Sequence, residues 1–329
     1  MSGVNLAKNY LKITLPIALI CVSIVATFNL IEARSGVRVE TQLANETPVI
    51  MFTPDKIRSD ILVFVAHGFA GSATLMQSIA LSVAKTGHRT FTFDFLGHGR
   101  HSLPYSGDIM TEKGATRLFV RQTNEVVNYY LKKEKISKAV IIGHSMASDL
   151  ILRTARLNSN IIGTIGISTY SDMIGRNKPR NVLIVNGMWE PSLRNKAIEI
   201  INSIGVENPQ EDTLYGSFHD GSARMITSIS STDHVGILYS NKTQQVINNW
   251  INQIIGEKLE LVTGDIGIWI LLLLSSLFCL FLVFVQNLPN KQRKKNDISF
   301  NGCVLGNLIA ATCTPVILSV YSIDLLTFT

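Results

Sequence analysis

Two long segments without a charged residue, one near each end of the chain, constrain most strongly how this sequence can fold. Residues 13–31 (ITLPIALICVSIVATFNLI) and residues 266–285 (IGIWILLLLSSLFCLFLVFV) carry no charge, and the second is the more apolar. A helix rises about 1.5 Å per residue, so about 20 residues match a hydrocarbon core roughly 30 Å thick. Neither segment has the polar face that a core helix would show. Both are therefore predicted to span a membrane.

These segments predict a division of the chain into three parts. The first segment is longer than the apolar part of a usual signal peptide and no clear A-x-A site follows it, which favours an uncleaved anchor. Residues 303–323 form a weaker third span, interrupted by Asn307 and Pro315. The predicted parts are an N-terminal anchor (1–34), a middle catalytic domain (35–264) and a C-terminal membrane region (265–329).

The loop 286–300 predicts the orientation in the membrane. It contains Lys291, Arg293, Lys294 and Lys295, and such clusters favour the cytoplasmic side. The middle domain is then expected outside the cytoplasm. This loop also contributes to the formal net charge of +6, so no nucleic-acid partner is expected. The four cysteines lie in or beside the apolar segments and show neither a disulfide framework nor a metal-binding spacing.

In the middle domain, short apolar runs alternate with helical patterns. The runs are rich in Val, Ile, Phe and Thr and mostly lack alternation, as expected of strands buried on both faces. They lie at 37–43, 49–53, 61–68, 90–95, 138–145, 164–169, 181–187 and 223–230. Residues 115–131 show the clearest helical spacing of apolar residues. This pattern predicts an α/β fold, with a mostly parallel sheet, helices on both faces and an antiparallel hairpin at its edge.

The stretch KAVIIGHSMASDL, at 138–150, predicts a nucleophile. A buried strand stops at Gly143, Ser145 follows two residues later, and a helix resumes after Ala147. A strand, a sharp turn of small residues around a serine and then a helix are the context of a nucleophile elbow. Ala147 replaces the second glycine of the G-x-S-x-G pattern, which is a mild departure. The alternative is an ordinary strand-to-helix turn whose small residues serve packing.

A serine hydroxyl needs a base and a carboxylate that orients it. Among seven histidines, His234 lies in a loop after the last strand and can reach over Ser145, whereas His144 is expected to point away. The alternative for His234 is a structural or solvent-exposed histidine. Glu190, directly after strand 181–187, is the preferred acid, with Asp172 as the runner-up; Asp212, Asp220 or no acid at all remain further alternatives.

An acyl-transfer site also needs hydrogen-bond donors for the oxyanion. The amide that follows the nucleophile belongs to Met146. A second amide is expected from Phe69 in HGFAGSA, where Gly68 and Gly71 permit a tight turn. The alternative is a plain glycine turn without a catalytic part.

Taken together, these motifs resemble the α/β-hydrolase superfamily of serine hydrolases. HGFAG, DFLGHGRHS, GHSMAS, NGMWEP and DHVG follow one another in the order of that superfamily's oxyanion loop, D-x-x-G-H-G turn, elbow, acid loop and histidine loop. The resemblance covers about residues 48–253. It implies a structural role for the D-x-x-G-H-G turn, and it departs from the usual pattern by carrying Glu at the acid position.

The resemblance also bears on the substrate. The usual helical cap of this superfamily is inserted between strands 164–169 and 181–187, and the interval here is too short to hold one. A pocket with little or no cap on a membrane-anchored chain suits a small-molecule or lipid-like ester. The prediction is a serine hydrolase for a carboxylic ester or a related acyl bond, with no cofactor and no metal. The alternative is a non-catalytic binding or assembly module in a membrane complex.

Overall fold

The computed structural model describes residues 2–108 and 112–287, with side chains from 14–108 and 113–285. The chain divides into two compact units, one made of residues 28–270 and the other of the terminal segments on either side. The predicted span at 303–323 and most of the loop 286–300 lie outside the described residues.

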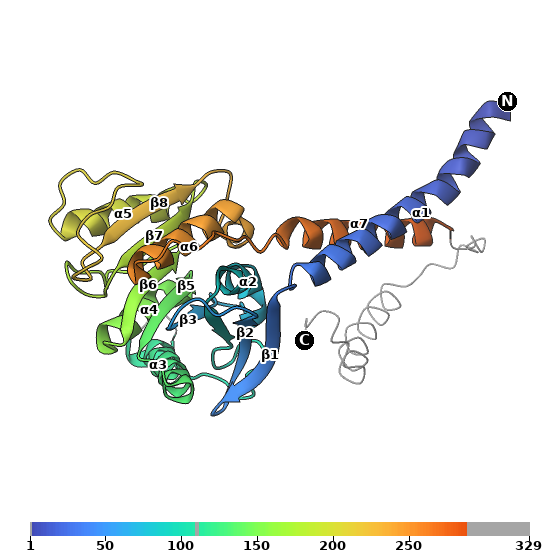
Figure 1. The fold of residues 1–329 in the computed structure, drawn as a ribbon. Helices are drawn as coiled ribbons and strands as arrows, with labels where there is room; N and C mark the ends of the chain where they lie inside the picture. Colours follow the sequence, from blue (N-terminus) through green and yellow to red (C-terminus); the bar gives the residue numbers. More distant parts are fainter. Residues whose placement is uncertain (1, 109–111, 288–329) are drawn as a thin grey trace. The chain divides into compact units, whose positions relative to one another are not determined.

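Eight strands form one sheet in residues 28–270, in the order β1-β2-β4-β3-β5-β6-β7-β8 (Figure 1). The strands are β1 (Val37–Ala44), β2 (Thr47–Pro54), β3 (Ile61–Ala66), β4 (Arg89–Phe93), β5 (Lys138–His144), β6 (Ile161–Ile167), β7 (Val182–Gly187) and β8 (Arg224–Ile229). β1 pairs antiparallel with β2, and β2 antiparallel with β4. Every later pairing is parallel. The predicted α/β class and the antiparallel edge hairpin are therefore confirmed.

Helices cover both faces of the sheet. They are α2 (Gln77–Thr86), α3 (Arg117–Glu134), α4 (Met146–Leu157), α5 (Pro191–Ser203) and α6 (Asn241–Ile255), with the short helices η1 (Ala73–Met76), η2 (Glu112–Thr116) and η3 (Gly236–Tyr239). α3 packs against α4, and α2 packs against α6. The pattern at 115–131 thus corresponds to the end of η2 and most of α3.

The hydrophobic core explains why the strands lack alternation. All six residues of β3 are buried, and its even-numbered members, from Leu62 to Ala66, join a cluster with α3 and α4. Successive side chains of a strand point to opposite faces, so Ile61, Val63 and Val65 face the layer that contains α2. A strand covered on both sides must be apolar throughout.

The connection after β6 is short and has no helix. Residues 168–181 run from β6 to β7 as turns and irregular backbone. A helical cap inserted at this point would cover the carboxyl ends of the strands. The absence of a helix from residues 168–181 agrees with the predicted fold with little or no cap.

Two helices outside the sheet match the predicted apolar segments. α1 (Ser2–Glu32) and α7 (Gly267–Asn287) contain windows, Thr14–Glu32 and Gly267–Val285, with mean hydropathies of 2.2 and 2.9. Both are long and apolar enough to cross a membrane. Within the terminal unit, the hydroxyls of Ser23 and Ser276 lie 2.8 Å apart and join the two helices.

Candidate active site

Ser145 occupies a sharp turn between β5 and α4. Its backbone has a positive φ of 54° with ψ −120°, a conformation that costs a non-glycine residue about 1–3 kcal/mol. The turn is held because the Ser145 amide donates to the Ile167 carbonyl at 2.9 Å, and the Ser148 amide donates to the Ser145 carbonyl at 2.8 Å. The surrounding parallel strands therefore fix a strained residue at the carboxyl end of the sheet.

The turn requires a glycine two residues before Ser145. A Cβ at Gly143 would lie 2.6 Å from the Ala147 carbonyl oxygen and 3.0 Å from a methyl group of Ile151. Such contacts are too close for any side chain, so α4 can start this near β5 only over a glycine. Ala147 itself is fully buried and fits as an alanine, which explains why the second glycine of the motif is dispensable.

His234 lies beside the serine. Its Nε2 is 2.8 Å from Ser145 Oγ, across 89 residues of sequence. The loop after β8 is shaped by Asp233, whose carboxylate accepts from the amides of Val235 at 3.1 Å and Gly236 at 2.6 Å. This local turn explains why Asp233 serves the backbone of the loop while its neighbour reaches the serine.

Glu190 completes a chain of hydrogen bonds. His234 Nδ1 lies 2.6 Å from Glu190 Oε1. The other carboxylate oxygen accepts from the Gly187 amide at 2.7 Å and the Ser168 hydroxyl at 2.8 Å. With three donors on a buried carboxylate, the acid is fixed in place and oriented toward the imidazole.

The pKa values of this pair shift in opposite directions. The hydrogen bond with Glu190 raises the pKa of His234 above its ordinary 6.5. Burial alone would raise the pKa of Glu190, but the hydrogen bonds from His234, Gly187 and Ser168 outweigh it and hold the pKa below its ordinary 4.5. Both shifts favour a carboxylate beside an imidazolium, the charge state that forms when the histidine accepts a proton.

His144 also takes part in the arrangement, although its place beside the nucleophile in the sequence predicts no such role. Its Nε2 lies 2.7 Å from the His234 carbonyl oxygen, and the two rings are 4.9 Å apart. Burial lowers the pKa of His144 to about 4, so the ring is neutral at pH 7 and Nε2–H can donate. His144 thus holds the backbone of the loop that carries His234.

Phe69 and Met146 line the same pocket as Ser145 and His234. Met146 is the first residue of α4, where an amide has no intrahelical acceptor. Phe69 lies in a tight turn closed by the hydrogen bond from the Gly71 amide to the Gly68 carbonyl at 3.1 Å. No hydrogen bond of the described residues uses either amide, so both are available for a bound oxyanion.

Asp94, in the D-x-x-G-H-G turn, has a structural role. Its carboxylate accepts from the amides of Ala73 at 2.6 Å and Arg100 at 3.0 Å, and so joins two loops. A Cβ at Gly99, whose φ is +53°, would lie 2.1 Å from that carboxylate. The turn therefore needs both residues for its shape.

Asp172, the runner-up acid, is not joined to the histidine. Its carboxylate pairs with the Lys196 ammonium at 2.7 Å and its side chain is largely exposed, while Glu190 occupies His234 Nδ1. Asp212 accepts from the Thr227 hydroxyl and Asp220 from the Ser222 amide. Glu190 is thus the carboxylate that the fold brings to the imidazole.

The pocket over Ser145 has a volume of about 500 Å³. Its walls include Leu150, Tyr170, Met173 and Leu193, which offer apolar surface to a ligand. No group of three or more potential metal ligands is found among the described side chains. The arrangement offers a base-assisted serine in a partly apolar pocket.

Comparison with known proteins gives a family match. The family model described as serine aminopeptidase, S33 (Hydrolase_4) matches residues 58–210. The sn-1-specific diacylglycerol lipase ABHD11 of Danio rerio is 34% identical over 104 residues, which are 31% of this chain and 28% of the relative. The chain thus aligns with less than a third of that lipase.

Similar solved structures include two hydrolases. A CIB-like hydrolase from Thermoplasma acidophilum is 16% identical with a TM-score of 0.48, over 65% of this chain and 97% of its own. A dienelactone hydrolase from Anabaena variabilis is 11% identical with a TM-score of 0.47, over 65% of this chain and 96% of its own.

Proposed function

Because the chain belongs to the α/β-hydrolase superfamily, we propose that it is a serine hydrolase that cleaves a carboxylic ester. The observation that supports this most directly is the continuous chain of hydrogen bonds from Ser145 through His234 to Glu190. In such a chain the imidazole, oriented by the buried carboxylate, can remove the proton of the serine hydroxyl and make it a nucleophile.

In the first half of the reaction, Ser145 Oγ attacks the ester carbonyl carbon and its proton passes to His234 Nε2. Glu190 stabilises the imidazolium that forms and keeps Nδ1–H directed toward itself. His234 then returns the proton to the leaving alcohol as the carbon–oxygen bond breaks. In the second half, water loses a proton to His234 and attacks the acyl carbon. The bond to Ser145 Oγ then breaks, His234 returns the proton to Oγ, and the acid is released.

The amides of Phe69 and Met146 are proposed to bind the oxyanion of each tetrahedral intermediate. The dipole of α4 adds positive potential at its N-terminus, where Ser145 lies. Removing one donor of this kind typically costs about 3 kcal/mol in the transition state.

The enzyme is further proposed to be anchored in a membrane and to act on a lipid-like ester. α1 and α7 would serve as anchors, and Phe69 and Tyr170 leave apolar rings exposed near the pocket. From the basic loop at 286–300, the catalytic domain is proposed to lie on the extracytoplasmic side.

Hydrolysis by the detergent-solubilised full chain tests the activity. A series of 4-nitrophenyl esters of increasing acyl length is compared with aminoacyl 4-nitroanilides, which an aminopeptidase would cleave. We expect ester cleavage that Ser145→Ala abolishes while the melting temperature of the protein is preserved. Cleavage of the anilides alone would reassign the enzyme as a peptidase. A folded wild type without either activity would favour a binding or assembly module.

A further inference from the structure

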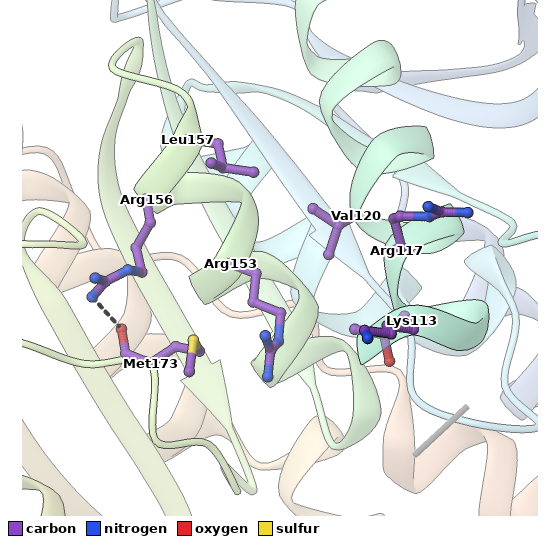
Figure 2. A pocket seen from close by; sticks show the side chains of 8 residues that line it. Lys113, Arg117, Val120, Arg153, Arg156, Leu157 and Met173 are labelled. Carbon is purple, nitrogen blue, oxygen red and sulfur yellow. Dashed lines mark hydrogen bonds between the residues drawn. The ribbon is translucent and has the colours of Figure 1, made fainter. Parts of the chain in front are cut away.

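A second pocket adjoins the one over Ser145. It has a volume of about 910 Å³ and lies between η2 and α3 on one side and α4 on the other. Thr116, Arg153 and Met173 line both pockets, so the two are adjacent. Figure 2 shows Lys113, Arg117 and Val120 on one side of the pocket and Arg153, Arg156 and Leu157 on the other, with the Arg117 guanidinium directed away from the second side in this view.

Among the residues whose side chains the structure describes, the charged ones that line this second pocket are all basic: Lys113, Arg117, Arg153 and Arg156. Arg153 pairs with Asp149 at 2.6 Å. Arg156 donates to the main-chain carbonyls of Met173 and Lys178, which are neutral acceptors. No ion pair between described side chains involves Lys113, Arg117 or Arg156. The described lining of the pocket therefore carries an excess of positive charge.

The remaining walls are apolar. Val120, Leu157 and Met173 lie among the basic residues, and Leu157 is 78% exposed at the end of α4. An exposed leucine beside arginines suits a ligand with both an apolar stem and an anionic end. Guanidinium groups can hold a carboxylate or phosphate through two parallel hydrogen bonds.

The helix α4 gives the separation between the serine and these charges. Ser145 precedes its first residue, and at a rise of about 1.5 Å per residue Arg153 lies about 12 Å and Arg156 about 16 Å further along the axis. One molecule could therefore place an ester at Ser145 and an anionic end against the basic residues if its arm is long and extended.

We propose that this basic pocket recognises an anionic group at the far end of the substrate, so that the enzyme prefers esters with one long arm that ends in a carboxylate or phosphate. The proposal rests on the proposed function, because it assigns the substrate class of the same site.

The test uses matched pairs of esters hydrolysed by the full chain in neutral detergent. In one pair the acyl arm is a long alkyl chain that ends in a carboxylate or in the neutral carboxamide; in the other, the same two ends are placed on the alcohol arm. The variant Lys113→Gln/Arg117→Gln removes two charges from the pocket. The control Lys132→Gln removes one exposed charge from α3 outside it.

We expect kcat/KM to favour the carboxylate in at least one pair. The double variant should reduce that preference about tenfold, since each exposed charge contact contributes about threefold. Lys132→Gln should leave the preference unchanged. High ionic strength should diminish the preference of the wild type, because salt screens exposed charges. If Lys113 and Arg117 had only a structural role, the double variant would show the same salt dependence of the carboxylate preference as the wild type.

Three results would overturn the inference. Equal kcat/KM values within both pairs would contradict it, and so would a preference for the carboxylate that survives in the double variant. In either case, hydrolysis that depends on Ser145 would still support the proposed function. If a folded wild type hydrolyses none of the four esters and shows no ester cleavage with the acyl-length series, the proposed function fails and the inference fails with it.

Discussion

Replacing Glu190 with glutamine is the most informative single change at the proposed triad, because it keeps the size of the side chain and removes its charge. The carboxylate has two oxygens and three donors directed at them: His234, the Gly187 amide and the Ser168 hydroxyl. Glutamine has one acceptor oxygen and one NH₂ group. It cannot accept from all three donors.

The backbone decides which contact is lost. The Gly187 amide is fixed by β7 and can only donate, so the amide oxygen of glutamine is expected to stay with it. The NH₂ group then faces His234 Nδ1, which must become an acceptor. The proton of the neutral imidazole moves to Nε2, where it faces Ser145 Oγ and prevents its deprotonation. An acid-to-amide change that gives the wrong tautomer costs about 10⁴ in kcat, or about 5 kcal/mol.

The assay is the pH dependence of ester hydrolysis. Since the hydrogen bond with Glu190 raises the pKa of His234, wild-type kcat/KM should fall on acidification with a midpoint above pH 6.5. In Glu190→Gln the residual activity should have its midpoint at a lower pH. Asp172→Asn is the matched control and should retain at least half of the wild-type kcat, since Asp172 pairs with Lys196. A loss of less than tenfold in Glu190→Gln, or a loss of 10³-fold or more in Asp172→Asn, would refute this reasoning.

Three further changes test the architecture. Gly143→Ala should lower the free energy of unfolding by about 1–3 kcal/mol, because its Cβ would meet the Ala147 carbonyl at 2.6 Å; an unchanged melting temperature would contradict this. Ser168→Ala removes one of three donors to Glu190 and should reduce kcat about tenfold at pH 7. An unchanged kcat would show that the Ser168 hydroxyl does not help to position Glu190. Burial lowers the pKa values of His67, His88 and His144 to about 4, so their contribution to stability is complete above pH 6.5 and falls toward pH 4, by at most about 3 kcal/mol each. Denaturant unfolding followed from pH 7 to pH 5 should show this decline.

Much of the fold could be predicted from the sequence because buried parallel strands carry their own signal. The apolar run at 61–68 and the one at 138–145 correspond to β3 and β5, which pair along their length. The turn around Ser145 was predictable too, because it requires small residues on both sides of the serine. In the structure, a Cβ at Gly143 would lie 2.6 Å from the Ala147 carbonyl oxygen.

Contacts between distant segments were harder to predict. Ser168 gives no signal in the sequence, since it is one serine at the end of a strand, and only the neighbouring strands β6 and β7 bring it to Glu190. His144 adjoins the nucleophile and is expected to point away from it, yet its ring contacts His234, through the carbonyl oxygen at 2.7 Å and the imidazole at 4.9 Å between ring centres. The basic pocket is likewise formed by segments that are separate in sequence, namely η2 with α3, the helix α4 and Met173.

Covalent labelling is the most direct test of whether Ser145 is a nucleophile that His234 activates. The detergent-solubilised chain is treated with a fluorophosphonate probe, and the modified peptide is identified by mass spectrometry in the wild type, Ser145→Ala and His234→Ala. We expect phosphonylation at Ser145 in the wild type, none at that position in Ser145→Ala, and labelling slowed at least a hundredfold in His234→Ala. A folded wild type that does not react, or that reacts equally fast without His234, would contradict this expectation.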